Sequence, residues 1–429
     1  MKKFLKRFAI VLTTLFCVAG VYVWFASRDI APQDVSDLTL LRPNPSPPSN
    51  GYTSFLEATR LLTERTNKCL TIGINKPVDT NAVLMVLESN EPAIALIEKA
   101  TQCSHFRQPD ATLTNVYNNI STRQFMAKLL SFKIKFLLLP SGRYEEAVQT
   151  GVTSLKFGNM HLQDTRCSLD FLTSSGLLSY GLSIIRNLAV SENLSSEQLT
   201  YLAQELNEIN SVNAAYRDAL KGEFLYMATA IDKIKDGTYS GETLDSFRMH
   251  DVPQKNRLYV PAIILHPNRT KSWIADECRA RLKEIAAPYS EKTNKVDDAA
   301  SKETCLLGFK PNLFGCALLD GYRIVADTGF KKKCKRESEI AATRLVVACH
   351  QYRMKEGKFP HTLQELVPAY LPEVPVDPYD AKPFRYKPEK KIVYSVGEDL
   401  IDSDGAGDVL NSSGYPIKRG KDLVYSLAP

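Results

Sequence analysis

The sequence lacks the short motifs that carry common enzyme chemistry. Its 429 residues contain no HExxH zinc motif, no GxSxG nucleophile elbow, no GxxxxGK[ST] phosphate loop and no GxGxxG dinucleotide loop. The nine cysteines form no CxxC pair and no zinc spacing with histidine. The six histidines are scattered, and we expect His350 at the surface or boundary of its helix. These absences predict a protein without an enzyme activity of these classes, and no cofactor of the corresponding kinds.

An excess of positive charge is also missing over most of the chain. Five of the 54 basic residues lie within the first 28 residues, which hold no acid, so the rest of the chain has 49 basic against 48 acidic side chains. A nearly neutral body does not offer the basic surface that nucleic-acid binding requires, so no nucleic-acid partner is expected.

What the sequence does contain is a long apolar run near its start. Residues 8–26 carry no charge and approach the roughly 20 residues that a helix needs to cross a bilayer. Four basic residues precede the run and one follows it, which predicts a cytoplasmic N-terminus. The alternative is a cleaved signal peptide, although Phe25 and Ser27 fit its cleavage site poorly. Either interpretation places the bulk of the chain outside the cytoplasm.

Changes in the residue pattern divide the chain into four parts. Residues 1–28 are the predicted membrane anchor, and residues 29–51 are a proline-rich spacer that should hold the folded part away from the membrane. Residues 52–328 show mostly helical periodicity. Residues 329–429 begin with one long helical pattern and then change to proline-rich loops and alternating strands, which predicts a small α+β module with an antiparallel sheet.

The clearest helical unit is a hairpin broken by Pro140. Its first helix should bury a stripe formed by Phe125, Leu129, Phe132 and Phe136. The step at residues 142–148 (GRYEEAV) resembles the turn between helices in tetratricopeptide-like repeats, but no clean recurrence of about 34 residues follows. We therefore expect a mainly α protein in which residues 52–328 form a stack of α-hairpins, loosely tetratricopeptide-like.

Short local signals support these elements. Ser195 with Gln198, and Thr362 with Glu365, have the spacing of helix-capping boxes. Beyond Cys17 there are eight cysteines, an even number outside the cytoplasm, so disulfides and buried free thiols remain alternatives. Strands are predicted from the segments PFRYK, KIVYSV and DLVYSL.

The C-terminal region carries an ordered set of motifs. A helix ends near a tyrosine, and Gly-x-Phe-Pro, Thr-Leu-x-x-Leu, Asp-Pro and Tyr-Ser-Val-Gly-x-Asp follow. In this combination it is similar to the globular part of the major pseudopilins of type II secretion systems. The matching residues are Tyr352, Gly357, Phe359, Pro360, Thr362, Leu363, Leu366, Asp377, Pro378, Tyr394, Ser395, Gly397 and Asp399. The family also has a glutamate five residues after its N-terminal cleavage glycine, whereas Phe25 follows Gly20 at that distance here.

An acidic stretch follows the last of these motifs. Pseudopilins hold a structural calcium ion in the loop after this strand pair, so the resemblance implies calcium here. The candidate ligands are Asp399, Asp402, Asp404 and Asp408. Calcium takes six to eight oxygen ligands, and Gly405 and Gly407 permit a tight turn. The alternative is a solvated acidic turn, and a catalytic role is least supported because an exposed loop does not raise a carboxyl pKa.

Together these features predict a non-catalytic protein-interaction or envelope-assembly component. It would sit in a bacterial inner membrane as a single-pass protein, with its N-terminus cytoplasmic and its bulk periplasmic. The expected partners are the lipid bilayer, through residues 8–26, and an envelope protein. An envelope hydrolase with its site in the helical domain and a divergent pilin-like subunit are the alternative functions.

Overall fold

The computed structural model describes residues 2–42, 49–62, 79–112, 115, 119–236, 264–292, 312–407, 409–410, 416–418 and 422–428. The helices are α1 (Lys2–Ala26), α2 (Gly51–Leu61), α4 (Thr80–Ser89), α5 (Glu91–Thr101), α6 (Ile120–Phe132), α7 (Tyr144–Gln163), α8 (Ser168–Val190), α9 (Ser196–Asn207), α10 (Val212–Lys235), α12 (Pro267–Lys283) and α14 (Leu313–Glu356). Shorter helical segments are η1 (Ser36–Leu38), the π-helical η3 (Lys133–Leu138), η4 (Leu363–Leu366) and η5 (Gly397–Asp399). The strands are β1 (Arg385–Lys387), β2 (Ile392–Ser395), β3 (Val409–Leu410), β4 (Pro416–Lys418) and β5 (Leu423–Ser426).

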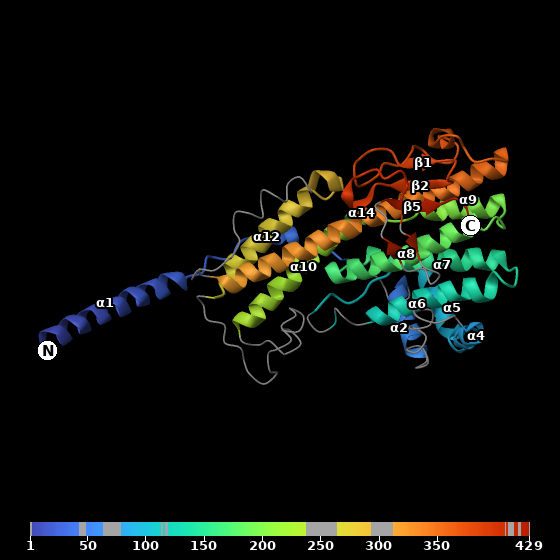
Figure 1. Ribbon diagram of the computed structural model, residues 1–429. Helices are drawn as coiled ribbons and strands as arrows, with labels where there is room; N and C mark the ends of the chain where they lie inside the picture. Colours follow the sequence, from blue (N-terminus) through green and yellow to red (C-terminus); the bar gives the residue numbers. More distant parts are fainter. Residues whose placement is uncertain are drawn as a thin grey trace.

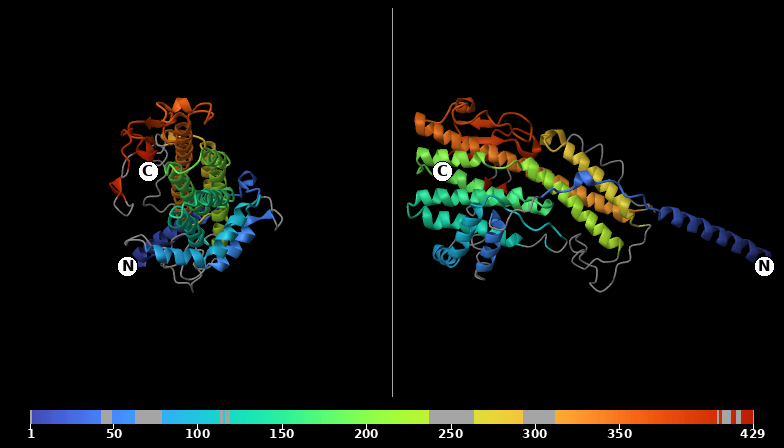
Figure 2. Two further views of the ribbon diagram at one scale, coloured as in Figure 1. Left: turned by 90° about the vertical axis from the view of Figure 1, so that its right-hand side faces the viewer. Right: turned by 180° about the vertical axis from the view of Figure 1, so that it is seen from behind.

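The predicted class, mainly α with a small antiparallel sheet, is confirmed. α1 projects from one end of an elongated helical body, and the sheet lies on the half of the body farther from α1 (Figures 1 and 2). The sheet has the order β1-β2-β5 with both pairs antiparallel, so each of the three predicted strands is present. It packs against α14 through β2 and β5.

The predicted helical hairpin is present as α6 and α7, and its break lies at residues 139–143. Its buried stripe differs from the expected one. Phe125 and Leu129 are buried, but η3 is wound as a π-helix, which rotates the following residues about the axis. Ile134 and Leu138 therefore enter the main core, while Phe132 and Phe136 are half-buried.

Helices α7 and α8 approach closely because glycines lie between them. A Cβ atom added at Gly181 would lie 2.6 Å from the Cα of Leu155, and one added at Gly158 would lie 2.5 Å from the Cα of Leu178. Side chains larger than hydrogen at these positions would force the helices apart. The capping box at Ser195 and Gln198, which starts α9 beside this pair, is confirmed.

One hydrophobic core runs from the helical body into the C-terminal module. It includes Leu178 of α8, Tyr322 and Leu345 of α14, and Val393 of β2. A second cluster, around Phe55 and Ile97, is formed mainly by α2, α4, α5 and α6. α14 begins at Leu313 and continues without interruption past the expected boundary at residues 328 and 329. The C-terminal module thus shares its long helix with the helical body.

The segment after α1 differs from the expected free spacer. Leu38 is fully buried, Asp37 accepts two hydrogen bonds from Arg279 of α12, and Arg42 pairs with Asp164. Residues 29–42 therefore lie against the body, because their side chains find partners on the helices. The proline-rich residues 43–48 lie outside the described residues.

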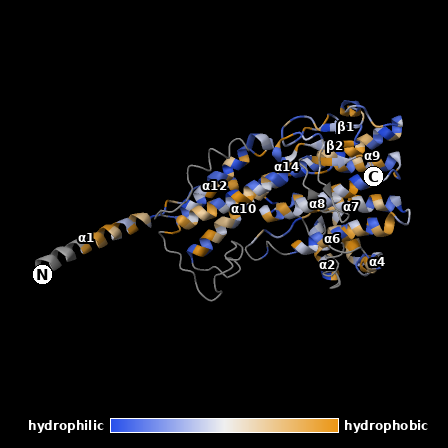
Figure 3. Cartoon of the chain, in the orientation of Figure 1, coloured by the Kyte–Doolittle hydropathy of each residue, from blue (hydrophilic) through white to orange (hydrophobic). Residues whose placement is uncertain are grey.

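α1 presents apolar side chains to the outside. The exposed ones include Leu15, Phe16, Val18, Val21 and Phe25, each more than half exposed. Figure 3 shows this part of α1 in the hydrophobic colour. Within the residues that the structure describes, no helix has both the length and the apolarity to cross a membrane.

The described cysteines show both states that the sequence left open. Cys316 is disulfide-bonded, while Cys167, Cys278, Cys334 and Cys349 are buried free thiols. Cys17 and Cys103 are also free. Cys69 and Cys305 lie outside the described residues.

Candidate functional site

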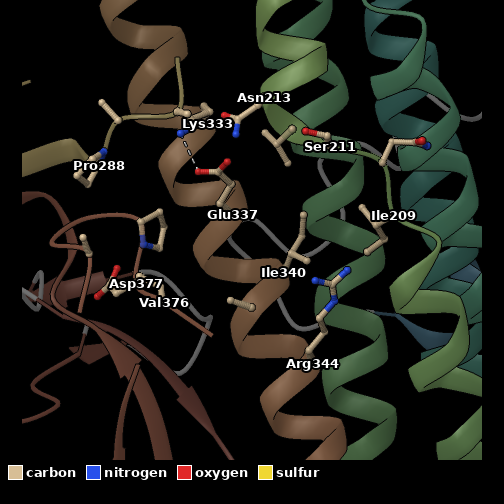
Figure 4. Close-up of a pocket in the computed structure, with 17 residues that line it drawn as sticks. Ile209, Ser211, Asn213, Pro288, Lys333, Glu337, Ile340, Arg344, Val376 and Asp377 are labelled. Carbon is tan, nitrogen blue, oxygen red and sulfur yellow. Dashed lines mark ion pairs between the residues drawn. The ribbon is translucent and has the colours of Figure 1, made fainter. Parts of the chain in front are cut away.

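The candidate site is a groove of about 450 Å³ where the helical body meets the C-terminal module (Figure 4). We call it the α14 groove. Its walls are residues 209–213 at the start of α10, residues 286–288 after α12, and the loop around Asp377. The floor comes from one face of α14, namely Lys333, Glu337, Ile340, Ala341 and Arg344. This volume lies in the range of small-ligand and peptide-side-chain sites.

The floor residues share a face because of helical periodicity. They recur at three- and four-residue intervals, which places their side chains one above another along α14. Figure 4 shows Ile340 and Arg344 on the side of α14 that faces Ile209 and Ser211. Ser211 fixes the start of α10 by accepting a hydrogen bond from the backbone amide of Ala214. Two rigid helices therefore position the groove.

One ion pair occupies the upper part of the groove. Nζ of Lys333 lies 3.0 Å from the carboxylate of Glu337, and only about 3% of the Lys333 side chain is exposed. Burial raises the pKa of Glu337, and the charge of Lys333 offsets part of that rise. Because the two charges neutralise each other, the ion pair lines the groove without adding net charge to it.

Arg344 supplies the groove with a cation that is only partly satisfied. One Nη donates to the backbone oxygen of Leu206 at 3.0 Å, but its buried Nε has no hydrogen-bond partner among the described residues. Burial lowers the pKa of Arg344. The buried Oδ1 of Asn213 likewise has no partner in the described part of the chain. A bound group with an acceptor oxygen would pair with the Arg344 guanidinium, which lines the groove.

Asp377 lines the groove but points its carboxylate into the C-terminal module. It is fully buried and accepts hydrogen bonds from the backbone of Tyr379, the hydroxyl of Ser395 and the backbone of Val396. Arg385 completes the set at 3.0 Å. Burial raises the pKa of Asp377, and the hydrogen bonds from Tyr379, Ser395 and Val396 oppose that rise. Asp377 thus anchors the loop that forms one wall and is not free to act on a ligand.

The side chains that line the groove are apolar, amide-bearing, hydroxyl-bearing or engaged in ion pairs, apart from Arg344. Its lining holds no histidine, cysteine or paired free carboxylates in the described residues, and Glu337 is engaged by Lys333. A nucleophile with an adjacent base, or two carboxylates with separated pKa values, would be needed for hydrolysis. What the groove offers is two apolar side chains on its floor, Ile340 and Ala341, together with a partly unsatisfied guanidinium and an amide oxygen.

A second polar cluster lies buried near the smaller core. Asp170 pairs with Arg166 and with Arg123, which also donates to Gln108. Asp164 accepts from the backbone of Gln108 as well as from Arg42. These side chains join α6, the start of α8 and the segment after α1, so their arrangement is explained by holding these elements together.

Within the predicted acidic stretch, basic side chains form ion pairs with Asp404. Asp404 pairs with Lys387 at 2.5 Å and with Lys390 at 2.6 Å, and these contacts lower its pKa to about 2. Asp402 accepts from the hydroxyl of Tyr394 at 3.1 Å. Asp399 accepts a hydrogen bond from the backbone of its neighbour Ile401.

The described acids do not converge as calcium ligands would. No group of three or more metal-binding side chains is present within the described ranges, and Asp408 lies outside them. Asp422, which the sequence reasoning missed, organises the loop by accepting from the backbones of Ser403, Gly405 and Ala406. Since backbone N–H groups and lysines fill these carboxylates, the arrangement of Asp399, Asp402 and Asp404 does not fit a calcium ion, and the predicted calcium site stays untested where it involves Asp408.

The expected exposure of His350 is wrong. Only 3% of the residue is exposed, and its ring lies edge-to-face with Phe359 at 5.3 Å. Burial lowers the pKa of His350 to about 4. The C-terminal module covers this face of α14, which a helical-wheel argument on the helix alone does not include.

The sequence reasoning did not find the α14 groove. Its residues come from four separate segments, and none of them forms a local motif. The one signal present was a pair of opposite charges four residues apart, Lys333 and Glu337, inside an otherwise buried helix. Comparisons with protein-family models, with curated proteins and with solved structures found no match.

Proposed function

We propose that this protein is a non-catalytic binding component of the bacterial envelope, tethered to the inner membrane by α1. The apolar run of residues 8–26 and the exposed apolar side chains of α1 support the tether. The N-terminus would be cytoplasmic and the helical body periplasmic. The disulfide at Cys316 favours an oxidising compartment, where such bonds persist.

The C-terminal module is proposed to be pseudopilin-like. The order of a long helix, a proline-rich loop and an antiparallel sheet packed on that helix supports this interpretation. In this chain the long helix is also part of the helical body, so the module would serve as one wall of the α14 groove and not as a filament subunit.

The α14 groove is the proposed binding site, and Arg344 is the observation that carries this proposal. Its occupant would be an extended segment of an envelope protein that presents a carboxylate. The carboxylate would accept from the guanidinium of Arg344, and apolar side chains would cover Ile340 and Ala341.

A photocrosslinking experiment in membranes tests this function. A benzophenone side chain replaces Val376, which lines the groove and is 54% exposed, or Ile324, which is 66% exposed on α14 outside the groove. We expect a discrete protein adduct from position 376 and none from 324. The Arg344→Met variant keeps the apolar stem of the side chain but loses the guanidinium, and should abolish the adduct.

Two outcomes would contradict the proposal. Equal adducts from both positions would show non-specific crosslinking, and an adduct unaffected by Arg344→Met would remove the role of the guanidinium. A melting curve of the Arg344→Met variant provides the control, since loss of one hydrogen bond to Leu206 should cost only about 1 kcal/mol.

A further inference from the structure

We propose that the end of the body next to α1 rests in the lipid headgroup layer of the membrane that α1 spans. This inference depends on the proposed tether. The end in question consists of the last turn of α10, the first turns of α12 and α14, and Ile264, and we call it the membrane-proximal end. Figures 1 and 2 show these three helix ends gathered where α1 meets the body.

The joint between α1 and the body contains no free linker. The ring Nε2 of the buried His266 lies 2.7 Å from the backbone oxygen of Ala26, the last residue of α1. Three residues later, the carboxylate of Asp29 accepts from the backbone amides of Asn268 at 2.7 Å and Arg269 at 3.0 Å. α12 has no capping side chain of its own, so Asp29 caps it from across the sequence.

The same joint is tied to the other two helices. Asn312, just before α14, accepts from the backbone of His266 at 2.7 Å and from the hydroxyl of Thr270 at 3.1 Å. Lys271 of α12 pairs with Asp232 of α10 at 2.7 Å. The orientation of α1 is therefore coupled to the whole bundle and not only to α12.

The length of the joint fixes the depth of this end. Trp24 and Phe25 are exposed aromatic residues at the end of the apolar run, the type that collects at the membrane interface. The Arg28 guanidinium stacks on the Trp24 ring at 3.6 Å. At 1.5 Å per residue, Ala26 lies only about 3 Å further along the axis than Trp24. A headgroup layer is about 5–7 Å thick on each side, so the start of α12 falls within it.

The surface chemistry of this end suits lipid headgroups. Ile264 and Leu313 are 39% and 50% exposed, and they lie together because the backbone of Phe314 donates to that of Ile264. Lys235 and Arg269 contribute cationic side chains, against the exposed acid Asp236. Exposed apolar side chains next to basic side chains bind at the interface of an anionic membrane. Direct continuity with α1 makes the lipid of the same bilayer the occupant.

Lipid photocrosslinking in the reconstituted full chain tests this placement. A benzophenone replaces Leu313 or Met354, which are equally exposed (50% and 51%) at the two ends of α14. The two positions are separated by about 60 Å along the helix axis at 1.5 Å per residue. A third variant carries the probe at Leu15 of α1. The vesicles contain phosphatidylcholine and phosphatidylglycerol, and adducts are detected by mass spectrometry.

We expect lipid adducts at Leu15 and Leu313 and none at Met354. Adducts at Leu15 alone would overturn the placement of the body while leaving the tether intact. Adducts at both ends of α14 would mean that the body lies along the membrane, and would also overturn it. Absence of adducts at Leu15 would refute the tether itself. Arg269→Glu with Lys235→Glu should reduce the Leu313 adduct in vesicles with phosphatidylglycerol but not in vesicles of phosphatidylcholine alone.

Discussion

Asp29 is the residue on which the rigidity of the joint depends most directly. In Asp29→Ala, the amides of Asn268 and Arg269 lose the only side-chain acceptor that the described residues provide for them. Loss of a capping side chain costs about 1 kcal/mol, and loss of a negative charge at a helix N-terminus adds about 0.5 kcal/mol. The total, about 1.5 kcal/mol, corresponds to roughly a tenfold increase in opening of the first turn of α12.

Hydrogen exchange measured by mass spectrometry reports that opening. Peptides that cover residues 267–270 should exchange about tenfold faster in Asp29→Ala, and near the wild-type rate in Asp29→Asn, which keeps an acceptor oxygen. Asp34→Ala is the matched control, because the Asp34 carboxylate accepts from the nearby Ser36, and its contact with Arg279 of α12 is made by the backbone oxygen, which the substitution keeps. If Asp29→Ala and Asp34→Ala exchange alike at these residues, the account of the joint is refuted.

Further predictions concern packing, buried charge and pH. Gly181→Ala should lower the free energy of unfolding by about 1–3 kcal/mol, because its Cβ would meet Leu155. Gly176→Ala on the same helix meets nothing and should raise it by about 0.5 kcal/mol. Thermal melts of the two variants should therefore shift in opposite directions. Asp170→Asn should cost about 3–5 kcal/mol, measured by denaturant unfolding, because it leaves two buried arginines without their shared carboxylate. The pKa of His350 is lowered to about 4 in the folded state, because burial disfavours the charged ring. The stability that the neutral ring contributes is therefore complete above pH 6.5 and is lost as the pH falls toward 4. The melting temperatures of wild type and His350→Leu, measured across this range, should converge at acid pH. Because Lys387 and Lys390 pair with Asp404, we expect millimolar calcium to leave the melting temperatures of wild type and Asp404→Ala unchanged. If calcium raised the melting temperature of wild type but not that of Asp404→Ala, a calcium site would be established instead.

Elements set by local pattern could be predicted from the sequence. The capping boxes at Ser195 and Thr362, the hairpin break at Pro140 and the three strands of the main sheet all follow from residues close together in the chain. Helical periodicity also predicted the mainly α class. These signals do not depend on which element packs against which.

Features that depend on tertiary contacts could not be predicted in this way. The π-helical turn of η3 changes which residues of the first hairpin helix face the core, and nothing in the local periodicity marks it. Asp29 caps a helix that begins more than two hundred residues later. Lys387 and Lys390, which lie on the preceding strand and turn, form ion pairs with Asp404. The acids were expected to be free because their partners are distant or lie on another element.

The contact between the segment after α1 and the helical body was also missed, for a physical reason. A proline-rich stretch favours extended backbone, and extended backbone by itself predicts that the folded part stands away from the membrane. The described part of this segment, residues 29–42, contains the short helix η1 and follows the helices of the body, since Leu38 is buried and Asp37 pairs with Arg279 there. An extended segment separates two bodies only where its side chains find no partner.

Protease protection of the full chain in spheroplasts tests the central claim, that α1 holds the body on the outer side of the inner membrane. Protease added outside should digest the body and leave a membrane-bound fragment that contains residues 8–26 and an intact N-terminus, as determined by mass spectrometry. A body that resists digestion until the membrane is lysed, or one released without α1, would contradict the account.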